Sequence, residues 1–380
     1  MKRWIAGMAA AAMSAGMARA GAETVPASVQ EHVDRGVIAG AVTLVADRDR
    51  VLALDAVGEA DMASHAPMRT NSVFWIASMT KPTTGALILM LQDEGKLSVD
   101  DPVAKHLPEF RDIRVKGAAA GADLRIRHLL THTSGLETVP STRPGATLAE
   151  LIAACAAKPL KFEPGSKWEY SNGGINTLGR IVEVVSGRPY AQFLRERLLE
   201  PLGMNETTFW PAGDLKARLA TSYGPRGDAG LEPVPIYFLQ GELDDTKRTA
   251  FPAGGLFSTA SDYARFLQML LRGGEWGGRR ILSREAVAQM TRTQTGDLRT
   301  GFVDGMSFGL ACGVVREPQG VTAALSPGSF GHGGAYGTQA WADPAAGRIY
   351  VLMIQRAKLP NADASDIRKA FQDAAAKAFP

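Results

Sequence analysis

Cysteine is scarce in this chain. Its 380 residues include only Cys155 and Cys312. Two cysteines are too few for the disulfide framework that stabilises many small secreted proteins. Small apolar neighbours such as Ala153, Ala154 and Ala156 suit a buried thiol, so we expect two free thiols. A single bridge between them remains open, because an oxidising compartment would permit it.

A surplus of charge of either sign is also missing. The chain has 42 Lys and Arg against 39 Asp and Glu. Three of the basic residues, Lys2, Arg3 and Arg19, lie in the first twenty residues, which contain no acid, so the rest of the chain is balanced. No basic run with interleaved aromatic residues occurs either. The sequence therefore predicts no nucleic-acid partner.

No hydrophobic run is long enough for a convincing membrane span. Lys2 and Arg3 precede an apolar run over residues 4–17, and Ala18-Arg19-Ala20 resembles a cleavage site. This pattern is typical of a signal peptide, here over residues 1–20 with cleavage near Ala20. The run is short and no cysteine lies near it for lipid attachment. We therefore expect export to the periplasm or beyond, with no stable membrane anchor.

Cofactor and metal motifs are absent as well. The chain has no G-x-x-x-x-G-K-[ST] phosphate-binding pattern. His128 and His132 have the spacing of two metal ligands on a helix, but no Glu follows His128 and no third ligand cluster accompanies them. The sequence predicts no cofactor and no metal, and a structural, hydrogen-bonded role for this pair.

Strand patterns stand at both ends of the chain and helix patterns between them. Residues 40–46 and 50–57 predict a hairpin, and residues 338–342 and 348–355 predict a second strand pair, with the last run apolar enough to be covered on both faces. Helices are predicted over residues 28–35, 78–94, 147–157, about 175–186, 191–199, 262–271, 284–291 and 364–378, with Thr147, Ser261 and Ser283 as N-caps.

This order predicts an α/β (α+β) fold: an antiparallel sheet built from both termini, flanked by helices, with a helical part inserted. The predicted parts are residues 21–115 with 300–380 for the α/β subdomain, and residues 116–299 for the helical one. Residues 211–256 are rich in Pro and Gly and contain Tyr223, Tyr237 and Phe238. A long irregular stretch in a compact domain is more often functional than idle, so we expect it to wall a pocket.

The chemistry of the chain centres on Ser78 and Lys81. At helical pitch, residues three apart share a face, so the amine can reach the hydroxyl. A serine hydroxyl needs a base to become a nucleophile, and a lysine serves if a dry setting lowers its pKa. Pro82 fits only the first turn of a helix, which places Ser78 near a helix N-terminus that favours developing negative charge.

A second candidate nucleophile is Ser307. Gly305-Met306-Ser307-Phe308-Gly309 matches the Gly-x-Ser-x-Gly elbow of α/β-hydrolases. That elbow needs a buried strand before it, a helix after it, and an acid and a histidine later in the chain. Here glycines follow, and His332 is the one downstream histidine. The match is better interpreted as a glycine-rich turn that leads into a strand.

Two further motifs follow Ser78-x-x-Lys81 along the chain: Tyr170-Ser171-Asn172 and Gly331-His332-Gly333-Gly334. In this order they resemble the penicillin-recognising serine hydrolases, which include class C beta-lactamases, D-alanyl-D-alanine carboxypeptidases and family VIII carboxylesterases. Residues 126–136 and 253–259 resemble further landmarks of that superfamily, so the resemblance covers nearly the whole chain. It implies a beta-lactamase/transpeptidase-like fold.

The resemblance also implies roles for the residues of these motifs. Ser78 would be the acylated nucleophile and Lys81 its base. Tyr170 would relay protons, for which a phenol needs a neighbouring cation such as Lys81 or His332. Asn172 would fix Lys81 and a substrate carbonyl through its amide. The backbone N–H groups of Ser78 and Ala335 would form the oxyanion hole.

The chain departs from the superfamily at Gly331-His332-Gly333-Gly334. Beta-lactamases usually carry Lys-Thr-Gly there, and both polar side chains hold a substrate carboxylate. Here His332 replaces the lysine and Gly333 the threonine, which weakens the anchoring of an anion on two counts.

We therefore expect an exported serine hydrolase that acts on small esters through an acyl-enzyme. The alternatives are a D-alanyl-D-alanine carboxypeptidase or D-amino peptidase, which would take peptide or amide substrates, and a class C-type beta-lactamase. A catalytically dead peptidoglycan-binding protein would have lost Ser78, Lys81 or Tyr170, and all three are present. The sequence does not indicate an oligomeric state.

Overall fold

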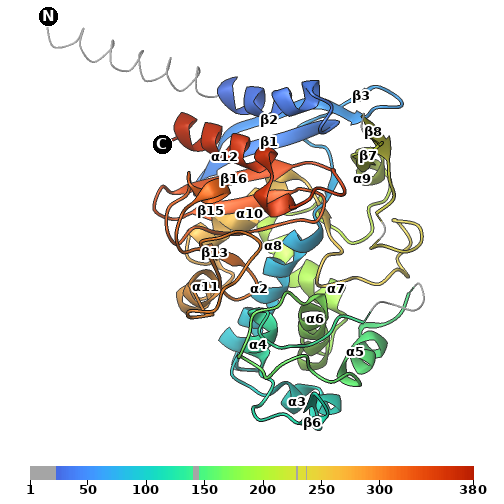
Figure 1. The fold of residues 1–380 in the computed structure, drawn as a ribbon, viewed down its shortest axis with the longest axis vertical. Helices are drawn as coiled ribbons and strands as arrows, with labels where there is room; N and C mark the ends of the chain where they lie inside the picture. Colours follow the sequence, from blue (N-terminus) through green and yellow to red (C-terminus); the bar gives the residue numbers. More distant parts are fainter. Residues whose placement is uncertain (1–22, 140–144, 228–229, 237) are drawn as a thin grey trace, which may run out of the picture.

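A computed structural model describes residues 23–139, 145–227, 230–236 and 238–380 (Figure 1). At its centre lies an eight-stranded antiparallel sheet. In spatial order its strands are β12 (Met306–Phe308), β13 (Gly313–Val315), β14 (Phe330–Gly333), β15 (Gln339–Asp343), β16 (Arg348–Met353), β1 (Gly40–Asp47), β2 (Val51–Asp61) and β3 (Ala66–Pro67). The two ends of the chain meet where β1 pairs with β16, with Val42 opposite Met353. The predicted sheet from both termini is confirmed.

The sheet is covered on both faces. Along β16, Ile349 and Val351 belong to one hydrophobic cluster, whereas Tyr350 and Leu352 belong to another. Successive side chains of a strand point to opposite faces, so an apolar run such as this one requires a cover on each side. The helix of residues 23–34 and α12 (Asp366–Ala378) provide one cover, and α2 (Thr80–Asp93) with α10 (Ala260–Leu271) provides the other (Figure 1).

Most of the helices between the two strand regions lie in the lower half of the molecule in Figure 1, although one short helix, residues 214–217, lies in the upper half. They are α3 (Val103–His106), α4 (Ile126–Leu130), α5 (Leu148–Ala156), α6 (Asn172–Ser186), α7 (Tyr190–Leu194), a π-helical turn (Arg195–Leu199) and α8 (Glu200–Leu202), followed by α9 (Asp214–Ala217) and, beyond α10, α11 (Arg284–Thr291). Short strand pairs join β4 (Phe74–Trp75) to β9 (Phe257–Ser258), β5 (Arg114–Val115) to β6 (Ala118–Ala119), β7 (Tyr223–Pro225) to β8 (Leu231–Pro233) and β10 (Glu275–Trp276) to β11 (Arg279–Arg280).

Most of the predicted helix ends match the structure. Thr147 and Glu150 cap α5 reciprocally, with each side chain accepting from the backbone N–H of the other. Ser283 caps α11 as predicted. The prediction of Ser261 as the cap of α10 was wrong. Thr259 is the cap, because it is still extended and accepts from the N–H of Asp262, whereas Ser261 lies inside the helix.

Two other helices differ from their predicted bounds. The first helix runs over residues 23–34 instead of 28–35. The predicted single helix over 191–199 is α7 followed by the π-helical turn. The division of the chain into subdomains remains a prediction. Within the predicted helical part 116–299, α10 packs against the sheet, with Phe266 and Leu267 in the same cluster as Leu44 of β1.

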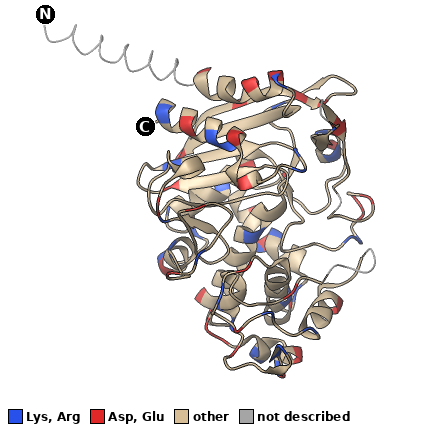
Figure 2. Ribbon diagram, viewed as in Figure 1, with Lys and Arg blue, Asp and Glu red and all other residues tan. Residues whose placement is uncertain are grey.

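Both cysteines are free and buried, as predicted. Among the described residues, no helix has the length and apolar character that a membrane crossing would need. Residues 1–20, the predicted signal peptide, lie outside the described residues. In Figure 2, ribbon positions of Lys and Arg and of Asp and Glu are intermixed over the helices and loops.

Candidate active site

A strained turn presents Ser78 between the sheet and the helical half. The pairing of β4 with β9 and the hydrogen bond from Ile76 N to Leu256 O fix the chain just before it. Ala77 then takes φ +45°, a left-handed conformation that costs a residue with a Cβ on the order of 1 kcal/mol. Ser78 follows in the short 3-10 turn Ala77–Met79, which continues into α2. As predicted, the serine stands at the helix N-terminus.

Lys81 is fully buried beside this serine. Its Nζ lies 2.9 Å from Ser78 Oγ and donates to the backbone oxygen of Ala253 over 2.5 Å. Burial lowers the pKa of Lys81 well below its ordinary value, an effect that the charge of Asp363 only partly opposes. When the Lys81 amine is neutral and donates one hydrogen to Ala253 O, its lone pair is free to accept the Ser78 proton. The dry setting that the sequence predicted for the base is present.

Tyr170 completes this cluster. The Lys81 Nζ lies 4.7 Å from the centre of the Tyr170 ring. The Tyr170 hydroxyl makes a side-chain hydrogen bond with Ser78. Burial raises the pKa of Tyr170 far above that of a free phenol, while the bond to Ser78 lowers it only slightly. The idea that a cation would lower this pKa was wrong, because the neighbouring Lys81 is itself driven toward neutrality. A buried neutral phenol is suited to pass a proton on rather than to act as a phenolate base.

Aromatic rings from distant segments hold the phenol in place. His132, at a ring distance of 4.3 Å, and Phe302, at 5.0 Å, pack against Tyr170. His132 Nδ1 accepts the N–H of Ser171, the N-cap of α6, so the imidazole also fixes the backbone after the tyrosine. Sequence reasoning missed this role. His132 was noted only for its spacing from His128, and no spacing connects it with Tyr170.

The predicted histidine pair is not a unit. His128 Nδ1 accepts the N–H of Arg125, whereas His132 bonds to Ser171, so each is hydrogen-bonded to backbone and not to the other. In the part of the chain that the structure describes, no cluster of three or more His, Cys, Asp or Glu could hold a metal ion.

Gly334 and Ala335 follow the end of β14 and lie against the turn of residues 76–79 that carries Ser78. A Cβ on Gly334 would lie 2.7 Å from Ile76 O and 2.1 Å from Thr338 Oγ1, so only glycine permits this approach. Ala335 lines the same cavity as Ser78. The two predicted donors of the oxyanion hole therefore share one cavity wall.

His332 and Gly333 occupy the adjoining end of β14. His332 is buried, and this burial lowers its pKa to about 3. Its Nδ1 donates to Gly333 O over 2.7 Å, which leaves Nε2 without a hydrogen-bond partner among the described residues. The imidazole is therefore neutral at pH 7, as predicted, and it supplies no cation to Tyr170.

Asn172 begins α6 and lines the cavity. Within the described residues it makes no hydrogen bond to Lys81. Its neighbour one turn on, Asn176, accepts the N–H of Ala253 and so fixes the carbonyl to which Lys81 donates. No sequence pattern marks Asn176, because its partner lies 77 residues away.

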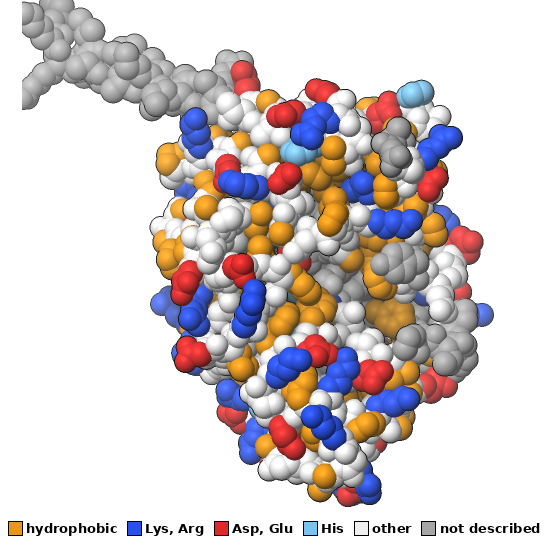
Figure 3. Space-filling model, viewed as in Figure 1, with side chains coloured by type: hydrophobic (Ala, Val, Ile, Leu, Met, Phe, Trp, Pro, Cys, Tyr) orange, Lys and Arg blue, Asp and Glu red, His pale blue; other side chains and the backbone are white. Residues whose placement is uncertain are grey.

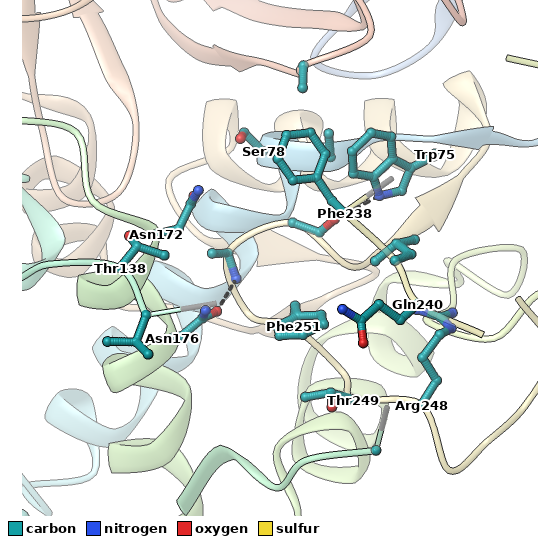
Figure 4. A pocket seen from close by; sticks show the side chains of 17 residues that line it. Trp75, Ser78, Thr138, Asn172, Asn176, Phe238, Gln240, Arg248, Thr249 and Phe251 are labelled. Carbon is teal, nitrogen blue, oxygen red and sulfur yellow. Dashed lines mark hydrogen bonds between the residues drawn. The ribbon is translucent and has the colours of Figure 1, made fainter. Parts of the chain in front are cut away.

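Ser78 opens into a cavity of about 330 Å³. Figure 3 shows the surface hollowed between the two halves of the molecule, with hydrophobic side chains at the base. Trp75 and Phe238, whose rings lie 5.6 Å apart, stand beside Ser78, whereas Gln240, Arg248 and Thr249 lie at the opposite end (Figure 4). Residues 238–254 supply much of this wall. The prediction that the irregular stretch 211–256 walls a pocket is confirmed, although Tyr237 lies outside the described residues.

Ser307 has none of these neighbours. It lies within β12, and not in a turn before a strand as predicted. It is 1% exposed and its hydroxyl pairs with Thr295 Oγ1 at 3.1 Å.

Comparison with known proteins agrees with this geometry. The sequence model described as Beta-lactamase matches residues 25–375. Penicillin-binding protein 4 of Amycolatopsis lactamdurans is 34% identical over 276 residues, which are 71% of this chain and 68% of the relative. Esterase EstB of Burkholderia gladioli is 30% identical over 351 residues, 84% and 86% of the two chains.

Among solved structures, EstCE1, a hydrolase with promiscuous acyltransferase activity, superposes with a TM-score of 0.80 and 27% identity. The superposition covers 94% of this chain and 99% of that one. The sheet from both termini, the inserted helices and the Ser78–Lys81–Tyr170 cluster are thus accompanied by similarity over nearly the whole chain. This chain belongs to the beta-lactamase family.

Proposed function

We propose that this protein is an exported serine hydrolase that cleaves small carboxylic esters through an acyl-enzyme on Ser78. The observation that carries the proposal is the contact of 2.9 Å between the Ser78 hydroxyl and an amine that is 0% exposed. Such an amine is held neutral by its surroundings and can take the serine proton.

In the acylation step, the Ser78 proton passes to Lys81 Nζ as Oγ bonds to the substrate carbonyl carbon. The negative oxygen of the tetrahedral intermediate would accept from the N–H groups of Ser78 and Ala335, and one such donor typically contributes about 3 kcal/mol. When the ester C–O bond breaks, the leaving oxygen takes the Tyr170 proton, and the Lys81 ammonium restores it. The alcohol leaves and both groups are again neutral.

In the deacylation step, water takes the place of the alcohol. Its proton reaches Lys81 through Tyr170 while its oxygen bonds to the acyl carbon. Collapse of the intermediate breaks the bond to Oγ, which recovers a proton from Lys81, and the carboxylic acid is released. The same three side chains therefore serve both steps with no net change.

Two observations favour esters over the other substrates of the family. The strand β14 offers neither a lysine nor a hydroxyl at His332 and Gly333 to hold a carboxylate. The cavity beside Ser78 is apolar near the nucleophile, with Trp75 and Phe238, which suits an acyl chain. The name of Esterase EstB agrees with an ester substrate, and the acyltransferase activity named for EstCE1 agrees with an acyl-enzyme.

Peptide cleavage at D-alanine is the second candidate, which the similarity to a penicillin-binding protein favours. Three substrates separate the candidates: p-nitrophenyl butyrate, an acyl-D-alanyl-D-alanine peptide and nitrocefin. We expect fast ester cleavage, weak D-alanine release and weak nitrocefin turnover. Mass spectrometry of protein quenched during turnover should find one butyryl group on the peptide that contains Ser78. Fast nitrocefin turnover with negligible ester cleavage would overturn the assignment.

Export rests on the pattern of residues 1–20 alone. Expression of the full chain in a Gram-negative host tests it. We expect activity in the periplasmic fraction and a mature N-terminus near residue 21, and an intact N-terminus in the cytoplasm would contradict it.

A further inference from the structure

Gly333 leaves a space that a carboxylate fills. A Cβ at this position would lie 2.0 Å from Asp363 Oδ1 and 2.4 Å from Gln339 Nε2. Both distances are far below van der Waals contact, so no larger residue fits while Asp363 stays where it is. Gly333 in the motif Gly331-His332-Gly333-Gly334 therefore has two consequences. It removes the hydroxyl that a threonine would supply, and it leaves room for the carboxylate of Asp363.

Asp363 is held in this position by several hydrogen bonds. Its Oδ1 accepts from Gln339 Nε2 at 3.1 Å, and Gln339 Oε1 in turn accepts from Trp341 Nε1 at 2.9 Å. Its backbone N–H donates to Asn361 Oδ1, and its backbone oxygen accepts from Arg368 Nη1 at 2.7 Å. A side chain fixed in this way presents its charge without paying the entropy of ordering it during binding.

The carboxylate borders a small groove of about 30 Å³ next to the catalytic cluster. Gly333, His332 and Phe302 line this groove together with Asp363. Phe302 is also the ring that packs on Tyr170 at 5.0 Å, and it is 47% exposed. The groove and the 330 Å³ cavity thus flank Ser78 and Tyr170. If the cavity takes the acyl chain, the groove faces the leaving group that Tyr170 protonates.

The other charged and titratable groups at the groove leave this carboxylate exposed to a ligand. His332 is neutral. Arg368 is 0% exposed, stacks on Trp341 at 4.4 Å and donates to Gln372 Oε1 and Asp363 O. It lines the same groove, but it is fully buried whereas Asp363 is half-buried. The carboxylate is therefore the more accessible of the two charges to a group that enters the groove.

We propose that Asp363, admitted by Gly333, sets the charge preference of the leaving-group side of the site. It disfavours substrates with a carboxylate next to the scissile bond and favours uncharged and cationic ones. The exposed face of Phe302 adds an aromatic surface for a cation. This inference rests on the proposed ester hydrolysis, and it narrows the substrate class to esters of neutral or ammonium-bearing alcohols.

Two isosteric ester pairs test the proposal. Butyrylcholine is compared with 3,3-dimethylbutyl butyrate, and O-butyryl glycolate with its methyl ester. In the wild type we expect kcat/KM to favour the cation over its neutral isostere and to be roughly tenfold lower for the anion than for its methyl ester, as a partly solvated charge pair at short range implies. Asp363→Asn should reduce both ratios toward one. Because each ratio compares two esters on the same protein, any change at Lys81 that alters all four rates alike cancels.

Asp366→Asn is the matched control. Asp366 is exposed at the start of α12, three residues further on, so its loss should leave both ratios unchanged. Equal effects of the two variants, or an Asp363→Asn variant that slows all four esters alike, would overturn the proposal. If Asp363→Asn does not fold, the wild-type ratios in rising salt decide. They should move toward one if charge causes them and stay constant if it does not.

Failure of the proposed function gives a different result. In that case none of the four esters is cleaved. The charge preference is then measured with an acyl-D-alanyl-D-alanine peptide and its C-terminal amide, for which Asp363→Asn should favour the free acid.

Discussion

Ser78 and Ser307 both stand in motifs known from serine hydrolases, yet the structure surrounds them differently. Ser78 follows a residue with positive φ, touches an amine and a phenol, and opens into a cavity. Ser307 lies in a regular strand, is closed off from solvent and pairs with a threonine. The difference shows that a nucleophile is defined by the base beside it and the space before it, and not by the glycines around it.

The largest effect expected from this comparison is on activity. Ser78→Ala should lower kcat/KM for p-nitrophenyl butyrate by on the order of 10⁴ or more, because the covalent route is lost. Ser307→Ala removes one hydroxyl with a single neutral partner and should keep activity within about twofold. Both variants should show unchanged circular dichroism. If Ser78→Ala kept full activity and Ser307→Ala had none, Ser307 would be the nucleophile.

Tyr170→Phe sharpens the same comparison. Loss of the proton relay should cost roughly 10² to 10⁴ in kcat/KM while the packing on His132 and Phe302 remains. Combined with Ser78→Ala, the variant should lose little more than Ser78→Ala alone, because the two groups act as a unit. Steady-state kinetics of the single and double variants measure this. Independent, multiplying losses would mean that Tyr170 has a role apart from Ser78.

Much of this architecture could be predicted because it is local. The two strand patterns within residues 40–57 and the apolar run in 348–355 identified the two ends of the sheet, and the capping pair Thr147 and Glu150 identified a helix start. The surroundings of the site could not be predicted in this way. His132, Phe302 and Asp363 reach the cluster from three separate segments, and nothing in their own neighbourhood marks them.

The direction of the Tyr170 pKa shift was missed for a related reason. The sequence shows that a lysine is available as a cation but not how far the folded chain removes it from water. Desolvation disfavours both the ammonium and the phenolate, so it moves the pKa of Lys81 down and that of Tyr170 up. The charge state of the pair depends on packing that only the folded chain provides.

His332 offers a prediction on stability at acid pH. Its pKa is about 3 in the folded chain against an ordinary value of 6.5, so the unfolded chain binds the proton more readily. The neutral form therefore stabilises the fold fully above pH 6.5, and the contribution is lost as pH falls from 6.5 toward 3. Between pH 7.5 and 4.5 this amounts to about 2 to 3 kcal/mol.

His332→Asn should remove that loss, because the amide can still donate to Gly333 O but does not titrate. Urea unfolding of both proteins at the two pH values gives the difference. The variant should lose less stability than the wild type over this interval by about the amount stated. An identical loss in the two proteins would mean that His332 is hydrated or charged in the fold.

The smallest effect concerns the cost of the base itself. The pKa of Lys81 in the folded chain is well below its value in the unfolded chain. At pH 7 the unfolded chain therefore binds a proton that the folded chain excludes, so the buried amine opposes folding.

Lys81→Met keeps the length of the side chain and removes this cost. We expect a variant without measurable esterase activity whose free energy of unfolding at pH 7 is roughly 1 to 3 kcal/mol higher. The gain should shrink as pH rises toward 10.5, where the unfolded lysine also loses its proton. Ser307→Ala, by contrast, should lower stability slightly, since the Thr295 hydroxyl loses Ser307 and keeps only the N–H of Phe308. If Lys81→Met is as destabilising as an ordinary core substitution, Lys81 serves the fold in the way Ser307 does, and the contrast between the two regions disappears.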